Sequence, residues 1–176
     1  MLLDDRGHAV RFPLKGDAWQ LVFFGYTNCP DVCPMTLHKV ASLLKALGAE
    51  AGRLQPVFIS IDSGRDHPED MRAFTGKFDA RVAGLTGDTA ALQTVAAEFG
   101  VLVRRYQGKT ALAYTMEHSS FLYLLDPQGR VSLLYPAAAG IEDIAHDLRR
   151  LWHSQDGVAA GGHVPAASGN QSASGG

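Results

Sequence analysis

The sequence has little cysteine, almost no excess charge and no long apolar run. Only two of its 176 residues are cysteines, too few for a disulfide framework in a domain of this size. The formal net charge is −2, and no basic stripe is available to bind the phosphates of a nucleic acid. The longest apolar runs, such as FLYLL at 121–125, fall well short of the roughly 18 residues of a membrane helix. We find no signal-peptide pattern and no internal repeat, so the composition favours a single domain that does not bind nucleic acid.

Apolar strand-like runs alternate along the chain with amphipathic helical segments. We expect strands at 19–26, 55–62, 81–87, 101–106, 111–116, 121–126 and 131–136. We expect helices that begin at Pro34 and Pro68, a helix capped by Asp88, and a last helix that buries Ile141, Ile144, Leu148, Leu151 and Trp152. This order predicts an α/β fold, a thioredoxin-like three-layer α/β/α sandwich over residues 1–153. The remainder, 154–176, is rich in Gly, Ala and Ser, and we expect a disordered tail.

Both cysteines lie in the segment GYTNCPDVCPMTL at 25–37, between a predicted strand and a predicted helix. Cys33 is expected at or beside the helix N-cap, with Cys29 just before it. Because a helix N-terminus lowers the pKa of a thiol, we expect a thiolate near neutral pH. A disulfide across so short a loop would stabilise the fold little, which favours a chemical role. Thiolates serve both disulfide exchange and soft-metal binding, so the turn leaves both roles open.

The spacing of the cysteines and a distant histidine favour a metal site. Three residues separate Cys29 from Cys33, one more than in thioredoxin-type redox motifs, so both sulfurs can converge on one point. In a thioredoxin-like fold, the loop before the terminal hairpin lies beside this turn, and here it carries His118. Two thiolates and one imidazole suit Cu(I), whereas a structural zinc site needs a fourth ligand that is not evident. Met116 is a weaker candidate for a fourth contact, through its thioether.

Three segments of the chain resemble the Sco/SenC family of copper proteins. They are CPDVCP at 29–34, ISIDSGRDHPEDMRAF at 59–74 and MEHSSFLYLLDPQGRV at 116–131, and the resemblance extends from about residue 2 to residue 152. It implies a thioredoxin-like fold with an additional β-hairpin. It also implies one copper ion, Cu(I) or Cu(II), per monomer, bound by Cys29, Cys33 and His118.

The resemblance further implies a metallochaperone that assembles the copper A centre of cytochrome c oxidase. The expected partner is the copper A subunit of the oxidase, with another periplasmic copper chaperone or a thioredoxin-like reductant as further partners. The family implies an extracytoplasmic location, in the bacterial periplasm or at the outer face of the cytoplasmic membrane. We expect membrane attachment through an N-terminal anchor that these 176 residues do not include.

Two aspartates are candidates for a supporting role around the copper ligands. Asp62 ends a predicted strand beside the cysteine turn, where it would tune the charge of the thiolates or of copper, or else cap the following turn. Asp31 lies between the cysteines, where it would stabilise the turn or assist docking and metal transfer.

A second hypothesis belongs to a different functional class. In it the protein is a thiol–disulfide oxidoreductase that keeps the copper-site cysteines of the oxidase reduced, with Cys29 and Cys33 as the catalytic pair. This activity does not need His118 as a ligand, and nothing in the sequence forbids both activities in one protein. A peroxidase is a weaker third hypothesis, because the local motif around the reactive cysteine of peroxiredoxins is absent.

Overall fold

Strand β3 (Trp19–Gly25) is the centre of the fold, and all seven of its residues are buried. The structure is a computed structural model that describes residues 1–108 and 114–160, with side chains up to residue 156. In it β3 pairs in parallel with β4 (Leu54–Ser60) and antiparallel with β8 (Phe121–Leu125). An aromatic and branched run of this kind is typical of a strand covered on both faces, as the sequence predicts.

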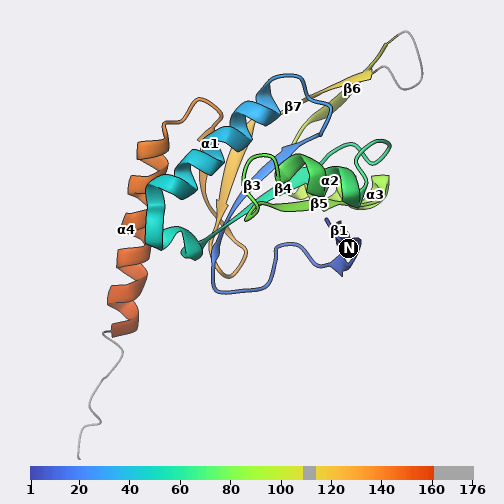
Figure 1. Cartoon of the computed structure of the whole chain (residues 1–176). Helices are drawn as coiled ribbons and strands as arrows, with labels where there is room; N and C mark the ends of the chain where they lie inside the picture. The colour runs from blue at the N-terminus through green and yellow to red at the C-terminus, as the bar shows by residue number, and fades with distance from the viewer. Residues whose placement is uncertain (109–113, 161–176) are drawn as a thin grey trace, which may run out of the picture.

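In the described residues, the elements form one large mixed sheet, which includes β3, β4 and β8, a separate hairpin and four α-helices (Figure 1). The seven-stranded sheet has the order β2-β1-β5-β4-β3-β8-β9, and β6 and β7 form a two-stranded sheet of their own. The other strands are β1 (Leu2–Asp4), β2 (Ala9–Val10), β5 (Ala83–Thr86), β6 (Val103–Gln107), β7 (Tyr114–His118) and β9 (Val131–Pro136). The helices are α1 (Val32–Leu47), the 3₁₀ helix η1 (Gly48–Arg53), α2 (Pro68–Thr75), α3 (Thr89–Glu98) and α4 (Ile141–Ala160).

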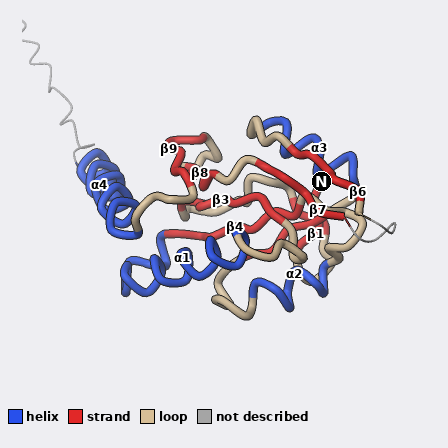
Figure 2. The backbone as a smooth tube through the Cα atoms, turned by 90° about the horizontal axis from the view of Figure 1, so that it is seen from above, coloured by secondary structure: helices blue, strands red, loops and turns tan. Residues whose placement is uncertain are grey.

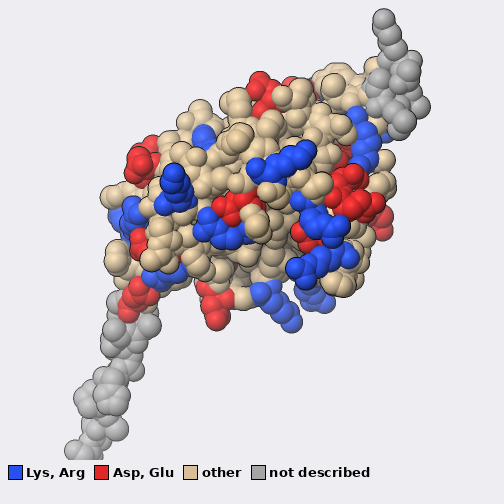
Figure 3. Space-filling model, in the orientation of Figure 1, with Lys and Arg blue, Asp and Glu red and all other residues tan. Residues whose placement is uncertain are grey.

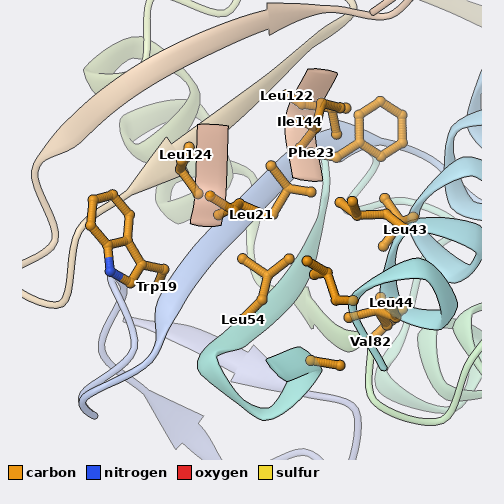
Figure 4. Close-up of a cluster of buried hydrophobic side chains, with 14 of the residues drawn as sticks. Trp19, Leu21, Phe23, Leu43, Leu44, Leu54, Val82, Leu122, Leu124 and Ile144 are labelled. Carbon is orange, nitrogen blue, oxygen red and sulfur yellow. The ribbon is translucent and has the colours of Figure 1, made fainter. Parts of the chain in front are cut away.

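Helices cover both faces of the sheet, as the tube view shows (Figure 2). On one face Leu21 and Phe23 of β3 pack in a cluster with apolar side chains of α1, α2 and α4 (Figure 4). On the other face Val22 and Phe24 pack with side chains of α3 and of β1. Because successive side chains of a strand point to opposite faces, β3 contributes to both clusters. This arrangement confirms the predicted three-layer α/β/α sandwich.

The surface agrees with the charge balance of the sequence. On the face drawn in Figure 3, lysine and arginine side chains are interspersed with acidic ones rather than gathered into one basic stripe. Among the helices described here, none has both the length and the apolar character required to cross a membrane.

The last helix is longer than the sequence analysis predicts. Helix α4 continues to Ala160, so the predicted boundary between residues 153 and 154 falls inside it. Its final turns contact the body of the protein, because Trp19 Nε1–H donates to Gln155 Oε1 at 3.0 Å and the Arg53 guanidinium donates to both carboxylate oxygens of Asp156. The expected disordered tail is therefore wrong for 154–160, which are helical, while residues 161–176 lie outside the described residues.

Two further differences concern strands. No strand is predicted before residue 19, yet β1 and β2 pair with each other and β1 pairs with β5. Strand β7 is predicted over 111–116 and is found at Tyr114–His118, whereas 111–113 lie outside the described residues. His118 is therefore the last residue of a strand of the β6–β7 hairpin rather than part of a loop. Such short strands carry too few residues for a clear hydrophobic period.

Candidate metal site

The cysteine segment connects the end of β3 to the start of α1. Cys29 N–H donates to the carbonyl oxygen of Tyr26 at 3.2 Å, which closes a turn directly after the strand. Met35 N–H donates to the carbonyl oxygen of Asp31 at 3.2 Å, so the first helical turn begins one residue before Cys33. Asp31 is therefore the N-cap, and Cys33 is the second residue of the helix rather than at or beside the cap as predicted. Pro34 still fits, because the first N–H groups of a helix have no intrahelical partner.

The two thiols are both free, but they differ in burial. Cys33 is fully buried in the first turn of α1, while Cys29 is half-buried. Cys33 N–H points at Cys29 Sγ, with a donor–acceptor distance of 3.5 Å. Burial raises the pKa of the Cys33 thiol, and the neighbouring Cys29 and the carboxylate of Asp66 raise it further. The predicted thiolate is therefore wrong for Cys33 in the metal-free protein, because loss of hydration outweighs the favourable helix N-terminus.

His118 is brought to the cysteines from a position 85 residues further along the chain. Its Nε2 lies 3.9 Å from Cys33 Sγ, and its Nδ1 lies 3.1 Å from the carbonyl oxygen of Ser119. A carbonyl oxygen only accepts, so Nδ1 carries the proton and the lone pair of Nε2 faces the sulfur. Burial lowers the pKa of His118, which keeps the imidazole neutral at pH 7.

Aromatic side chains enclose the imidazole. The ring of Phe23 lies 6.2 Å and the ring of Tyr26 lies 6.4 Å from the ring of His118, both with edge-on geometry. Both aromatic residues are buried, so the side of the imidazole that faces the sheet is screened from water. Such a shell limits the access of solvent to a metal ion bound at the site.

The donor set has the chemistry of a soft-metal site. It consists of two sulfur atoms and a neutral imidazole nitrogen with its second nitrogen already hydrogen-bonded, the usual state of a metal-binding histidine. In the part of the chain that the structure describes, no three His, Cys, Asp or Glu side chains already stand in metal-coordinating geometry. The structure thus brings Cys33 and His118 together as a pair, with Cys29 joined to Cys33 through the backbone N–H.

The two candidate supporting aspartates differ in burial and in contacts. Asp62 is buried, and its carboxylate accepts hydrogen bonds from Arg65 Nε and from the Tyr114 hydroxyl rather than from either cysteine. Asp31 is exposed at the start of α1, and its side chain makes no capping hydrogen bond. The half-buried Met116 lies on the same face of β7 as His118, since the two residues are two positions apart.

Asp66 is a site residue to which the sequence analysis assigns no role. It is 1% exposed and accepts hydrogen bonds from Thr27 N–H at 3.0 Å, Thr27 Oγ1 at 2.6 Å and Ser60 Oγ at 2.7 Å. Burial raises the pKa of Asp66 even though these donors act in the opposite direction. The contacts tie the segment before Cys29 to the end of β4. Asp66 lies in the second of the three family-like segments, but that pattern does not say which backbone it binds.

Comparison with known proteins identifies relatives of this fold and site. The profile described as SCO1/SenC matches residues 1–153. A curated relative, the mitochondrial protein SCO2 homolog of Homo sapiens, is 36% identical over 152 residues, which cover 85% of this chain and 57% of that protein. The chain therefore spans little more than half the length of this relative.

Solved structures agree with the sequence comparison. The structure of Bradyrhizobium japonicum ScoI with copper bound has 38% sequence identity and a TM-score of 0.77, covering 85% of this chain and 94% of that chain. BsSco, described as a member of the Sco family of cytochrome c oxidase assembly proteins with a disulfide switch, has 25% identity and a TM-score of 0.67, covering 85% and 88%. Profile, relatives and fold together establish that the chain belongs to the SCO1/SenC family.

Proposed function

We propose that the protein is a copper metallochaperone that holds copper through Cys29, Cys33 and His118 for assembly of the copper A centre of cytochrome c oxidase. One observation carries the proposal, namely the 3.9 Å approach of His118 Nε2 to Cys33 Sγ. Because Nδ1 is engaged by Ser119, the free lone pair of the imidazole is directed at the sulfur. The similarity to a ScoI structure described with copper bound supports the choice of metal.

The chemistry of the site suits Cu(I) as cargo rather than as a permanent cofactor. Thiolate and imidazole are ligands that Cu(I) prefers, and a three-donor site leaves an approach for an incoming ligand. Cu(I) would leave by ligand exchange, in which a deprotonated thiol of the partner adds as a cysteine of this site dissociates and takes up a proton. No electron moves in this exchange, so the copper stays Cu(I).

The proposed partner and location follow from the same family membership. The acceptor would be the copper A subunit of the oxidase, whose site contains cysteines, and the protein would work outside the cytoplasm at the membrane. BsSco, a relative of this chain, is described as belonging to a family of cytochrome c oxidase assembly proteins, which supports the oxidase as partner. Supply by another copper chaperone, or reduction by a thioredoxin-like protein, belongs to the same proposal.

An anaerobic Cu(I) titration of the reduced protein against a chromophoric competitor tests the copper proposal. We expect one tightly bound Cu(I) per monomer and a loss of affinity of more than about 100-fold in His118→Ala, because the loss of a ligand costs more than the loss of a residue behind it. His146→Ala is the matched control, since His146 is exposed on α4. Equal affinity of the wild-type protein and His118→Ala would rule out His118 as a ligand.

A second function, thiol–disulfide exchange, is favoured by the contact between Cys33 N–H and Cys29 Sγ. The contact holds the two cysteines close together, and Cys29 is the more accessible sulfur. Cys29 would attack a disulfide of the partner to form a mixed disulfide, with release of one partner thiolate. Cys33 would then attack Cys29 Sγ, leaving a Cys29–Cys33 disulfide and a fully reduced partner. The two electrons come from the cysteine pair, which a thioredoxin-like reductant would restore.

Substitution of His118 separates the two functions. If copper binding needs His118 and disulfide exchange does not, His118→Ala binds copper weakly yet reduces a model peptide disulfide at the wild-type rate. Cys29→Ser loses both activities. A His118→Ala protein that loses disulfide exchange as well would contradict this separation.

A further inference from the structure

The hairpin that carries His118 is separate from the main sheet and forms one wall of a cavity. Strands β6 and β7 pair with each other in a sheet of their own (Figure 1). Between this hairpin, α3 and the segment after β4 lies a cavity of about 540 Å³. Its wall includes Ile61, Leu92, Ala96, Val101 and Met116. Met116 is the residue of this hairpin that packs partly against the core cluster, and the cavity lies beside it, so polar contacts of β7 also contribute to its position.

Tyr114, the first residue of β7, makes the densest set of these contacts. Its ring lies between two guanidinium groups, with the Cζ atoms of Arg65 and Arg105 at 3.5 Å and 3.6 Å from the ring centroid. Its hydroxyl donates to the buried carboxylate of Asp62, and its carbonyl oxygen accepts from Arg65 Nη1 at 3.0 Å. Arg65 Nε also donates to Asp62 at 2.6 Å. Both the side chain and the backbone of Tyr114 are therefore tied to the segment after β4.

A second contact ties β7 to the body at Met116, which lies between Tyr114 and His118 in the sequence. Met116 N–H donates to the Tyr26 hydroxyl at 3.3 Å, and the ring of Tyr26 lies 6.4 Å from the ring of His118. Arg65 reaches this ring as well, with Cζ at 5.7 Å from its centroid. Strand β7 is thus tied to the body at two alternate positions, and His118 is the next residue on the same face.

The contacts of Tyr114 are buried and costly to break, so they hold β7 against the body of the protein. Asp62 is 4% exposed, and a buried carboxylate that loses one of its donors leaves a costly unpaired group. The attraction between a cation and an aromatic face is also stronger when both are shielded from water. The side chain of Arg65 is only 14% exposed. Movement of β7 away from the body would break both interactions at once.

We infer that Tyr114, held by Asp62 and Arg65, is a positioning residue that fixes His118 opposite Cys33. The inference rests on the proposed function and assigns to Asp62 a role other than tuning the copper charge. Asp62 acts on the imidazole through the hairpin, not on the sulfurs. Tyr114 itself contacts no ligand atom, so its effect on copper must pass through His118.

A double-mutant cycle on Cu(I) affinity tests this route. We expect Tyr114→Leu to weaken Cu(I) binding by about 10-fold, the lower end of the range for residues that orient a metal ligand. In the His118→Ala background the same substitution should change the affinity less than about 2-fold, because coupled effects vanish when the shared group is removed. Tyr106→Leu is the matched control, since Tyr106 is half-exposed on the opposite face of the same hairpin. An equal loss in both backgrounds, or in Tyr106→Leu, would overturn the inference.

NMR of the metal-free protein tests the positioning without copper. We expect the ring signals of His118 to shift and broaden in Tyr114→Leu and to stay close to wild type in Tyr106→Leu. Tyr114→Phe keeps the ring between the guanidinium groups and should give a smaller change, and it remains usable if Tyr114→Leu does not fold. Unchanged His118 signals in both Tyr114 variants would overturn the inference. If instead these signals move while His118→Ala binds copper like wild type, the copper proposal fails and the positioning stands.

Discussion

Gly25 lies directly beneath the thiol of Cys33. A Cβ atom added to Gly25 would stand 2.7 Å from Cys33 Sγ and 2.7 Å from Cε2 of Phe58, far closer than atoms in van der Waals contact. Gly25 is the last residue of β3, and its missing side chain lets the first turn of α1 approach the strand. The position of the buried cysteine therefore depends on a glycine four residues before Cys29.

We predict that Gly25→Ala displaces Cys33. Overpacking of a closed core costs about 1–3 kcal/mol of unfolding free energy, and the shifted sulfur should weaken Cu(I) binding as well. Urea unfolding and the competitor titration measure the two effects. Gly52→Ala is the control, because an added Cβ there would meet no heavy atom within 4 Å beyond the adjoining residues of its own helix. A Gly25→Ala protein with wild-type stability and affinity would contradict the prediction.

The two cysteines should react at different rates with an alkylating reagent. Cys29 is half-buried, whereas Cys33 is fully buried and has a raised thiol pKa, and only the thiolate is nucleophilic. We predict that iodoacetamide modifies one thiol of the metal-free protein at least about 10-fold faster than the other. Mass spectrometry of Cys29→Ser and Cys33→Ser assigns the two phases. A fast phase that survives in Cys29→Ser would show that Cys33 is the accessible thiol.

Thr27→Val should loosen the segment before Cys29. The substitution keeps the shape of the side chain but removes the hydroxyl that donates to Asp66 at 2.6 Å. A buried carboxylate that loses a donor costs about 1–3 kcal/mol, so we expect a fall of this size in the unfolding free energy. Thr94→Val, on an exposed part of α3, should change it by less than about 0.5 kcal/mol. Equal stability of the two variants would argue against the anchoring role of Asp66.

Asp126 gives the fold a defined dependence on pH. Burial alone would raise the pKa of Asp126, but hydrogen bonds from the backbone N–H groups of Arg130 and Gln128 and from the Arg130 guanidinium hold it below its usual value. An acid with a lowered pKa in the folded state contributes stability above its unfolded pKa of about 3.9. This contribution is lost as the pH falls through the lower, folded value.

We therefore predict that Asp126→Asn costs stability at pH values above about 4 and much less in stronger acid. The loss should be about 1.5–3 kcal/mol at pH 7, the range for hydrogen bonds to a charged group, and should shrink as the pH falls below about 4. Chemical denaturation at a series of pH values measures it. Asp17→Asn, at an exposed position, is the control and should follow the wild-type curve. A loss that is the same at pH 7 and pH 3 would contradict a charge-dependent role of Asp126.

Much of the fold could be predicted because its strands and helices have clear periods. The run 19–26 and the helix after Asp88 were identifiable from buried strand character and from a capping side chain, and Asp88 does accept from Ala91 N–H. Strands β1 and β2 were not identifiable, since each has only two or three residues and β1 joins the sheet through β5, about 80 residues further along the chain. The end of α4 was missed for a related reason, because Gln155 and Asp156 stay helical through contacts with Trp19 and Arg53.

The candidate ligands were predictable from residue types and spacing, but their surroundings were not. Two cysteines beside a helix start, and a histidine before an apolar strand, mark Cys29, Cys33 and His118 without any coordinates. The raised pKa of Cys33 was not predictable, because desolvation depends on the side chains that cover the sulfur. The partners of Asp62 were not predictable either, since Tyr114 lies 52 residues away.

The sequence by itself determined the local chemistry of this protein: which atoms are soft donors, which segments form strands and helices, and the absence of a strongly charged surface. These properties depend on side-chain types and short spacings, which act within one element. Only the tertiary structure decided that Nε2 of His118 faces Cys33, that Asp62 supports the hairpin, and that Gly25 admits the sulfur. Those relationships join residues far apart in the chain, so they exist only after the sheet, the helices and the hairpin have packed together.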